Sequence, residues 1–408
     1  MVAEALKNIQ FRWLLGSSTA FFLVLHGQML TRSVLAWRLT GDEMSLAWIN
    51  LAFALPMVVV AFPGGVLTDR INRLAILKVC QLLLLINELV IFALLLTGDL
   101  ALWQLILSCI VGGLLFPIVL PTRTAIVFNL VGNRLLGSAT ALTMTTMNIS
   151  RVIGPALMGA LIAAQSITAA YGLASALFFI AWLCTLPINN SYAPNTVKAI
   201  KTSIAKDISE GFRYIHNNKP IMLSILFGVL PMMLTIPMHT ILVLFTDTIW
   251  HVGEQGLGIA MSVAGLGGTL GALWITKRSQ NPKRTNLMFS GALSFGILVI
   301  CFSFSQSFYV ALVLLFFANA GSAVSSTLNH TITQLLADDE QRGRVSSMSM
   351  AAIGFAPVIV APIAWGAKHY GVDVSVAVAA ILLTAVTLVF FLRSNVLREL
   401  DQHVKDAT

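Results

Sequence analysis

The stretch LAILKVCQLLLLINELVIFALLLT, residues 74–97, decides the class of fold. Among these residues only Lys78 is basic and only Glu88 is acidic. As one helix, an apolar run of this length crosses the bilayer's hydrocarbon core of roughly 30 Å, which takes about 20 residues. The run is continuous, whereas β-barrel strands alternate in polarity over segments of about 10 residues. The stretch therefore predicts a membrane-spanning helix.

The whole chain has the same character. Hydrophobic residues make up 57% of its 408 positions and charged residues only 10%, with a mean hydropathy of +0.86. A soluble domain carries about 25% charged residues, so this chain cannot cover a soluble surface. Its four cysteines lie in apolar runs without a CxxC pair, so we expect no zinc site, no other metal and no cofactor. Composition thus predicts an all-α membrane protein.

Further apolar runs, separated by charges and turn-forming residues, predict twelve spans. A hydrophilic stretch, 189–219, is interpreted as a cytoplasmic linker between two six-helix bundles, 1–188 and 220–408, the second with a short cytoplasmic tail. An offset of 206 residues carries Gly65 onto Gly271 and Leu130 onto Leu336, which favours a duplication with two pseudo-symmetric halves. The predicted spans are 13–37, 45–68, 74–97, 101–127, 136–163, 168–188, 220–246, 255–276, 285–304, 307–334, 345–367 and 373–393.

The formal net charge is +8, but the placement of the charges argues against a nucleic-acid partner. With both termini in the cytoplasm, all but four of the 25 Lys and Arg residues fall at cytoplasmic ends or loops. Arg38 and Lys368 fall on the other side, and Arg32 and Arg151 lie within spans. This distribution follows the positive-inside rule. The basic charge therefore indicates orientation in a membrane.

The loop between the second and third spans reads GGVLTDRINR, residues 64–73. Gly65 allows two helices to approach closely, and Asp69 lies beside Arg70 and Arg73 at a helix junction. Such a cluster can hold the cytoplasmic side closed, and open it when ion pairs exchange partners. The alternative is a basic turn in which Asp69 caps a helix. We expect a gating motif here.

This loop resembles the G-x-L-x-D-R-x-x-R motif of the major facilitator superfamily. The segments FRWLLGSSTAFFL, ISRVIGPALMGAL and DISEGFRYI resemble the drug and siderophore efflux branch, which includes macrolide and enterobactin exporters. The equivalent stretch of the second half, GLGGTLGALWITKRSQ, departs from the motif because Ile275 stands where the acid would fall. The resemblance covers nearly the whole chain and implies an alternating-access exporter of the bacterial inner membrane, commonly driven by proton entry.

Two further gating residues follow from the same comparison. Gly154 and Pro155 resemble the antiporter motif of the superfamily, in which a missing amide hydrogen bond and small residues allow bending and tight packing. Ser150 and Ala160 depart from the glycine-richer pattern. Arg123, at the end of the fourth span, is expected to pair with Asp69.

Arg151 lies near the middle of the fifth span, where a charge costs several kcal/mol and is by default functional. On a period of 3.6 residues it shares a face with Met144, Met147, Asn148 and Pro155. That face presents an amide, a guanidinium and two thioethers. Arg151 either serves substrate binding or coupling, or is tied structurally to helix carbonyls or a buried acid.

Glu88 is the only carboxylate well inside a predicted span. Burial favours the neutral form of a carboxyl group, so Glu88 is the proton-coupling candidate. The superfamily fold instead places the third helix of each half at the periphery, where Glu88 would be neutral or paired with an arginine. In the first span Gln28 and Arg32 share a face and are substrate or coupling candidates, or Arg32 simply extends toward the outer interface.

The tenth span carries a polar stripe that is unlike a lipid-facing surface. Asn319, Asn329 and His330 are its substrate or coupling candidates, accompanied by Ser322 and Ser326. His330 either titrates during transport or is a hydrogen-bonded structural histidine.

These features predict a secondary active transporter that exports a small amphipathic compound by proton-coupled antiport. The compound would be a drug, siderophore or metabolite. No GxxxxGK[ST] loop occurs, so the energy should come from an ion gradient.

The alternatives are a proton-independent facilitator, an uptake carrier or a non-transporting receptor on the same fold. An enzyme is not expected, because no HExxH set or nucleophile–base pair is found. The expected partners are the small-molecule substrate, protons and the lipid bilayer, and we expect a monomer.

Overall fold

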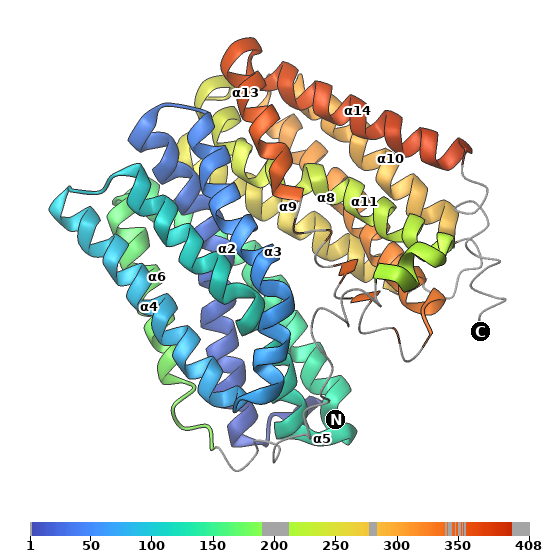
Figure 1. Cartoon of the computed structure of the whole chain (residues 1–408). Coiled ribbons are helices and arrows are strands. Elements are labelled where there is room, and N and C mark those ends of the chain that lie inside the picture. Colours follow the sequence, from blue (N-terminus) through green and yellow to red (C-terminus); the bar gives the residue numbers. More distant parts are fainter. Residues whose placement is uncertain are drawn as a thin grey trace. The chain divides into compact units, whose positions relative to one another are not determined.

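A computed structural model describes residues 2–189, 212–276, 284–338, 341, 345–346, 348–349, 352, 354 and 356–393, and over these it is helical without strands. Figure 1 shows the helices as coiled ribbons. Their bounds are α1 Val2–Ala5, α2 Ile9–Thr40, α3 Met44–Arg70, α4 Arg73–Thr97, α5 Leu102–Ala164, α6 Ile167–Leu183, α8 Lys219–Leu244, η2 Phe245–Ile249, α9 Gly253–Thr276, α10 Arg284–Ser303, α11 Phe308–Leu336, η3 Ala356–Ile359, α13 Val360–Tyr370 and α14 Val372–Arg393.

The helix ends follow local sequence signals. The side chain of Asn8 accepts hydrogen bonds from the first amides of α2, and Asn72 does the same for α4. Both helices end at a glycine with positive φ, Gly41 at 60° and Gly98 at 80°. Asparagine satisfies free amides at a helix start, and glycine adopts the left-handed conformation at a helix end without steric cost.

The fourth and fifth predicted spans are joined in one long helix, α5. Residues 128–135, which the prediction left between the two spans, are helical except for Gly132, whose φ of 68° and ψ of 177° interrupt the helix. Two candidate membrane spans result, Leu102–Gly132 and Arg134–Ala164. The prediction of two spans is right, but the break between them is one residue. Glycine alone adopts this backbone conformation readily.

Ten helices of the described chain are long and apolar enough to cross a membrane. The predicted sixth span corresponds to α6, an apolar helix of 17 residues that is shorter than those ten. The predicted eleventh span, 345–367, is described only in part, where η3 and α13 lie. Twelve spans in two six-helix bundles therefore stays a prediction.

Contacts between Cα atoms divide the chain into two compact units. Unit 1 contains Met1–Gly41, Trp48–Lys201 and Glu254–Ser262, and unit 2 contains Asp42–Ala47, Thr202–Gly253 and Val263–Thr408. The boundary at Lys201 falls inside the predicted linker, most of which, 190–211, lies outside the described residues. The domain limits proposed from sequence thus stay a prediction.

In unit 1, α2 packs against α5 and α6, and α4 packs against the same two helices. Glycines bring α2 and α5 into backbone contact. A Cβ atom on Gly154 would lie 2.8 Å from the carbonyl oxygen of Leu23, and one on Gly27 would lie 2.6 Å from Met158. The tight packing that the Gly154-Pro155 pattern predicts is present here.

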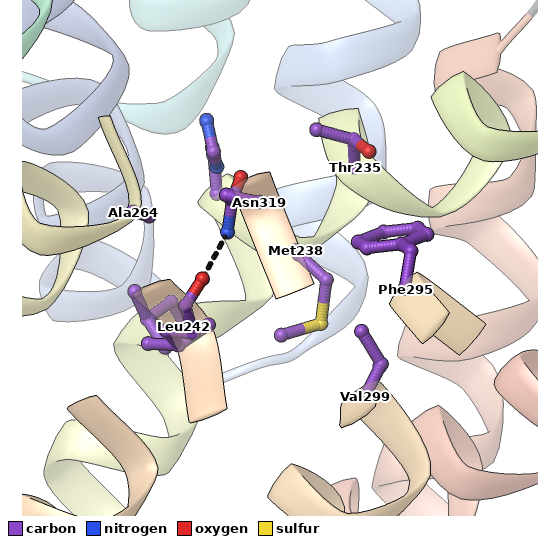
Figure 2. A pocket seen from close by; sticks show the side chains of 9 residues that line it. Thr235, Met238, Leu242, Ala264, Phe295, Val299 and Asn319 are labelled. Atoms are coloured by element: carbon purple, nitrogen blue, oxygen red, sulfur yellow. Dashed lines mark hydrogen bonds between the residues drawn. The ribbon is translucent and has the colours of Figure 1, made fainter. Parts of the chain in front are cut away.

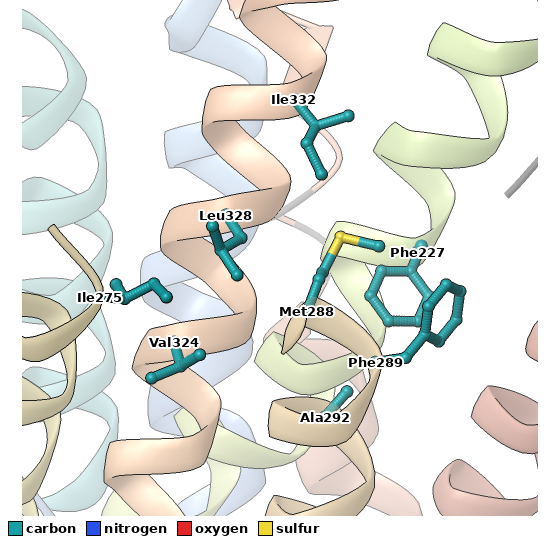
Figure 3. Close-up of a cluster of buried hydrophobic side chains, with 8 residues drawn as sticks. All are labelled: Phe227, Ile275, Met288, Phe289, Ala292, Val324, Leu328 and Ile332. Carbon is teal, nitrogen blue, oxygen red and sulfur yellow. The ribbon is translucent and has the colours of Figure 1, made fainter. Parts of the chain in front are cut away.

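In unit 2, α10 packs against α11 and α14, and α8 packs against α11. Figure 3 shows the apolar core between these helices, where Phe227 of α8 and Phe289 of α10 lie with ring centroids 4.5 Å apart. Ile275 of α9 belongs to this core and is buried. On α9, a Cβ on Gly271 would lie 2.5 Å from the carbonyl oxygen of Ala320 in α11. Ile275, which replaces the motif's acid, is therefore a packing residue.

The helix bounds support the duplication predicted from the offset of 206 residues. The offset carries the last residue of α3, Arg70, onto the last residue of α9, Thr276. It carries the first residue of α5, Leu102, onto the first residue of α11, Phe308. It also carries the end of α4 onto the end of α10, and the start of α6 to within one residue of the start of α14. The two halves thus share one helix order.

Replacement of Gly132 by alanine is expected to lower stability by about 1–3 kcal/mol, because alanine is strained at positive φ. Gly137→Ala is the matched control: the same helix carries it, and a Cβ there meets nothing within 4 Å. We expect Gly137→Ala to keep or raise stability, since alanine favours a helix. Thermal unfolding in detergent measures both. Equal midpoints for the two variants would contradict the assigned break.

Candidate functional site

Two clusters of buried polar side chains lie inside unit 1. The first surrounds Arg123 of α5, whose side chain is 2% exposed. Its Nη1 donates to Ser18 Oγ at 3.0 Å and to Ser17 Oγ at 3.3 Å, both on α2. Its guanidinium lies 4.4 Å from the ring centroid of Phe21. A buried guanidinium is stabilised by hydrogen-bond acceptors such as these serine hydroxyl oxygens and by the face of an aromatic ring.

Gln81 of α4 completes the Arg123 cluster. With its amide oriented so that both ends are satisfied, Oε1 accepts from Arg123 Nη2 and Nε2 donates to the Ala181 carbonyl at 3.0 Å. Ser17 Oγ also donates to that carbonyl, at 2.8 Å. The cluster therefore joins α2, α4, α5 and α6. No ion pair to Arg123 occurs among the described side chains, and the side chain of Asp69, its expected partner, lies outside them.

The second half has an uncharged version of this cluster. The 206-residue offset carries Ser18 onto Ser224 and Arg123 onto Asn329, and Ser224 Oγ donates to Asn329 Oδ1 at 3.1 Å. Ser224 also lies 2.7 Å from Thr333 Oγ1, and Asn329 is buried. A hydrogen bond between equivalent positions thus links α2 to α5 in one half and α8 to α11 in the other, with the serine accepting in the first and donating in the second. Only the first half carries the charge.

The second cluster surrounds Glu88 of α4, which is 1% exposed. Gln28 of α2 donates through Nε2 to Glu88 Oε1, and Gln28 Oε1 accepts from Arg32 Nε at 3.1 Å. Thr31 Oγ1 donates to the same Gln28 oxygen at 3.1 Å. Gln28 therefore bridges a guanidinium and a carboxylate, whose charges attract each other across it. Arg32 thus bonds to Gln28 inside the bundle, and its role in substrate binding or coupling stays a prediction.

In the second half an apolar pocket takes the equivalent place. The offset carries Gln28, Arg32 and Glu88 onto Leu234, Met238 and Ser294. The pocket encloses an empty volume of ≈ 290 Å³, part of it open to solvent. Figure 2 shows Met238, Leu242, Phe295 and Val299 around it, with the Asn319 side chain donating to the Leu315 carbonyl at 2.9 Å. Its lining residues are Thr235, Met238, His239, Leu242, Ala264, Phe295, Val299, Leu315 and Asn319.

Other predicted site residues lie apart from these clusters. Arg151 and Asn148 of α5 are partly exposed, and neither has a hydrogen bond or ion pair within the described chain. Arg151 interacts electrostatically with His26 of α2. His330 is exposed and makes no hydrogen bond to another described residue. Pro155 is buried beside Gly154.

The gating motif is described only at its end. Gly65, Asp69 and Arg70 belong to α3 by their backbone, and the surroundings of Gly65 and the side chains of Asp69 and Arg70 lie outside what the structure describes. Arg73 is the first residue of α4, and its side chain is partly buried. The gating role of this motif stays a prediction.

Sequence reasoning missed the residues that hold Arg123, which are Ser17, Ser18 and Gln81. Serine on an apolar helix carries a weak signal, because its hydroxyl also bonds to the helix's own carbonyls. The offset could have found one of them, since it pairs Ser18 with Ser224 and Phe21 with Phe227. Gln81 has an apolar counterpart, Leu287, so the repeat gives no indication of it.

Long apolar helices with charged clusters inside them define a multi-pass membrane transporter. Over residues 4–407 the chain matches the family described as transmembrane secretion effector. The chain belongs to this family of the major facilitator superfamily, as the loop motif predicted. The family consists of membrane transporters and not enzymes.

Among curated relatives, the staphyloferrin A transporter of Staphylococcus aureus is 22% identical over 91% of this chain and 93% of its own length. The enterobactin exporter EntS of Shigella flexneri is 27% identical over 221 residues, so the match spans about half of each protein, 54% of this chain and 51% of the exporter.

Solved structures confirm the fold. The nucleoside transporter NupG superimposes with a TM-score of 0.75 at 14% identity, covering 95% of this chain and 100% of that one. A bacterial homolog of the human lysosomal transporter Spinster superimposes with a TM-score of 0.71 at 13% identity, covering 98% of both chains. At such identity the similarity concerns the fold alone.

The Glu88 cluster generates a stability prediction. Gln28→Leu removes the relay and leaves the carboxylate without its hydrogen-bond donor, so we expect a loss of about 1–3 kcal/mol. The triple variant Gln28→Leu, Arg32→Met, Glu88→Ser carries the residues of the second half and removes both charges. We expect it to recover most of the loss, since replacing all partners together is far less costly than removing one. Thermal unfolding of the purified protein tests this. A single variant as stable as the parent chain would contradict it.

Proposed function

We propose that this chain is a secondary active exporter of a small amphipathic compound, coupled to proton entry by antiport. It acts by alternating access in the bacterial inner membrane, as a monomer with both termini in the cytoplasm. The compound is a siderophore, a drug or a metabolite, and the named relatives favour a siderophore. Family membership along nearly the whole chain supports transport, and the charge distribution supports the orientation.

The observation that carries the proton-coupling part is the Glu88 cluster. Glu88 is buried in an apolar helix, where a carboxylate requires compensation. Ionised, it accepts from Gln28 Nε2 and lies in the field of Arg32. Protonated, it no longer balances Arg32, and its neutral carboxyl group accepts a weaker hydrogen bond from the Gln28 amide than the carboxylate does. One proton therefore changes the bonds between α2 and α4.

That change supplies a physical basis for coupling. Arg32 lies against α5 as well, because a Cβ on Gly112 would come within 3.5 Å of its Nη1. A shift of Arg32 on protonation of Glu88 is thus felt by three helices, α2, α4 and α5. Binding of a proton can bias two conformations of a transporter only through such a difference in contacts.

A proton-independent facilitator or an uptake carrier is the second candidate within transport. The Glu88 cluster then has a structural role, in which a permanently ionised or permanently neutral carboxyl group joins α2 to α4. Nothing in the family or in the relatives favours the non-transporting receptor.

Inverted membrane vesicles that hold this protein test the proposal. With an acidified lumen, we expect enterobactin or staphyloferrin A, the compounds named in relatives, to accumulate inside, and an uncoupler to abolish the accumulation. Glu88→Gln keeps the size of the side chain but cannot exchange a proton. We expect it to abolish proton-driven accumulation while leaving downhill exchange.

The control is Gln104→Glu, which places a carboxyl at the start of α5 outside the cluster and should accumulate substrate like the parent chain. Accumulation that survives the uncoupler would overturn antiport. Full proton-driven accumulation by Glu88→Gln would remove Glu88 from coupling and leave export itself standing.

A further inference from the structure

The polar face of α5 around Arg151 belongs to neither the Arg123 cluster nor the Glu88 cluster. Arg151 is a guanidinium within the span Arg134–Ala164, and no ion pair or hydrogen bond satisfies it among the residues described. The sole carboxylate deep in a predicted span, Glu88, is engaged by Gln28 and Arg32. A charge at this depth of a membrane is costly, so the Arg151 guanidinium is by default a functional group that binds an anionic partner.

This face lies on the opposite side of α5 from a stripe of exposed apolar residues. Ile149, Ile153 and Leu157 are exposed at four-residue spacing and form one side of α5. Arg151 lies two residues from Ile149 and from Ile153, which places it about half a turn around the helix from them. Arg151, which is partly exposed, and Met144, which is exposed, thus share the side of α5 away from this stripe.

A second unsatisfied group lies beside Arg151. The Nε2 atom of His26 on α2 is buried and has no hydrogen-bond partner, and the Arg151 charge acts on this imidazole. The two helices are held in register here, since a Cβ on Gly154 would lie 3.4 Å from His26 Cβ and 3.1 Å from the Gly27 amide nitrogen. The contact at Gly154 thus holds His26 one helical turn from Arg151, within reach of its charge.

Two adjacent nitrogen groups of this kind, one of them cationic, fit an anion. A guanidinium holds a carboxylate through two parallel hydrogen bonds, and a neutral imidazole adds one donor. A single positive charge balances one negative charge. Met144 and Met147 share the face of Arg151, and thioether side chains adapt to apolar groups of varied shape.

We propose that Arg151 and His26 form a subsite that binds the carboxylate of an amphipathic anion, with Met144 and Met147 contacting its apolar part. This inference rests on the proposed transport function and names the substrate class of that transporter: organic anions, in preference to neutral or cationic compounds of the same shape.

A matched set of probes tests this on the purified full chain in detergent. The set is 4-phenylbutyrate, its neutral amide and 4-phenylbutylamine, which share an apolar body and differ in charge. A ligand that binds the folded state raises the unfolding temperature. We expect the carboxylate to stabilise the parent chain, and the amide and the amine to leave it unchanged.

The variants locate the effect. Arg151→Gln should require at least about tenfold more carboxylate for the same stabilisation, as expected when one partner of a desolvated charge pair is truncated. Arg151→Lys keeps the charge but not the paired donors, so a severalfold weakening is expected; this variant decides the matter if Arg151→Gln does not fold. His26→Leu should weaken binding less. Arg12→Gln, the same change on an exposed arginine, should bind like the parent chain.

Absence of stabilisation by the carboxylate, equal stabilisation by the amide or amine, or unchanged binding in Arg151→Gln would each overturn the subsite. Failure of the transport proposal has a different signature. Charge-selective binding that depends on Arg151, together with no accumulation in inverted vesicles, would refute export and leave the subsite standing.

Discussion

A bilayer offers no hydrogen bonds and no solvation for charge, and the structure of this chain depends on that constraint. Polar side chains inside the bundles must find partners on neighbouring helices, and the partners decide how those helices pack. Arg123 is surrounded by Ser17, Ser18 and Gln81, and its cluster ties together α2, α4, α5 and α6. Glu88 and Arg32, relayed by Gln28, join α2 to α4 a few turns away.

The duplication shows which of these contacts belong to the fold and which belong to the first half alone. The hydrogen bond between Ser18 and Arg123 recurs as that between Ser224 and Asn329, so a polar link at this place is part of the repeated design. The charge is not repeated. Where the first half has Glu88 and Arg32, the second has Ser294 and Met238, of which Met238 lines an apolar pocket. Where the loop motif has Asp69, the second half packs Ile275 in its core. The ionic groups that a gate or a proton relay would require are thus concentrated in one half.

Much of the fold was predictable from the sequence because length and hydropathy suffice for a helix that must satisfy its own backbone. The run 74–97 became α4, Arg73–Thr97, almost to the residue, and the offset of 206 residues anticipated shared helix ends. The break at Gly132 was placed too broadly, because many sequences can connect two helices and only the backbone angles single out one glycine. For the candidate site, Glu88, Gln28 and Arg32 were recognised individually as polar residues at membrane depth. Their connection was not, since it depends on how α4 is rotated against α2.

By itself, the sequence indicated that this chain crosses a membrane many times as helices, and that it belongs to the major facilitator superfamily, and it predicted a duplication that the helix bounds support. Those properties follow from the order of apolar and charged residues along one dimension, together with short motifs. Tertiary structure alone decided which polar groups meet: that Arg32 bonds to Gln28, that Arg123 lies on Phe21 among serines, and that His26 lies within reach of the Arg151 charge. Such pairings arise between helices far apart in sequence, and they depend on helix rotation and close glycine contacts that no periodicity encodes.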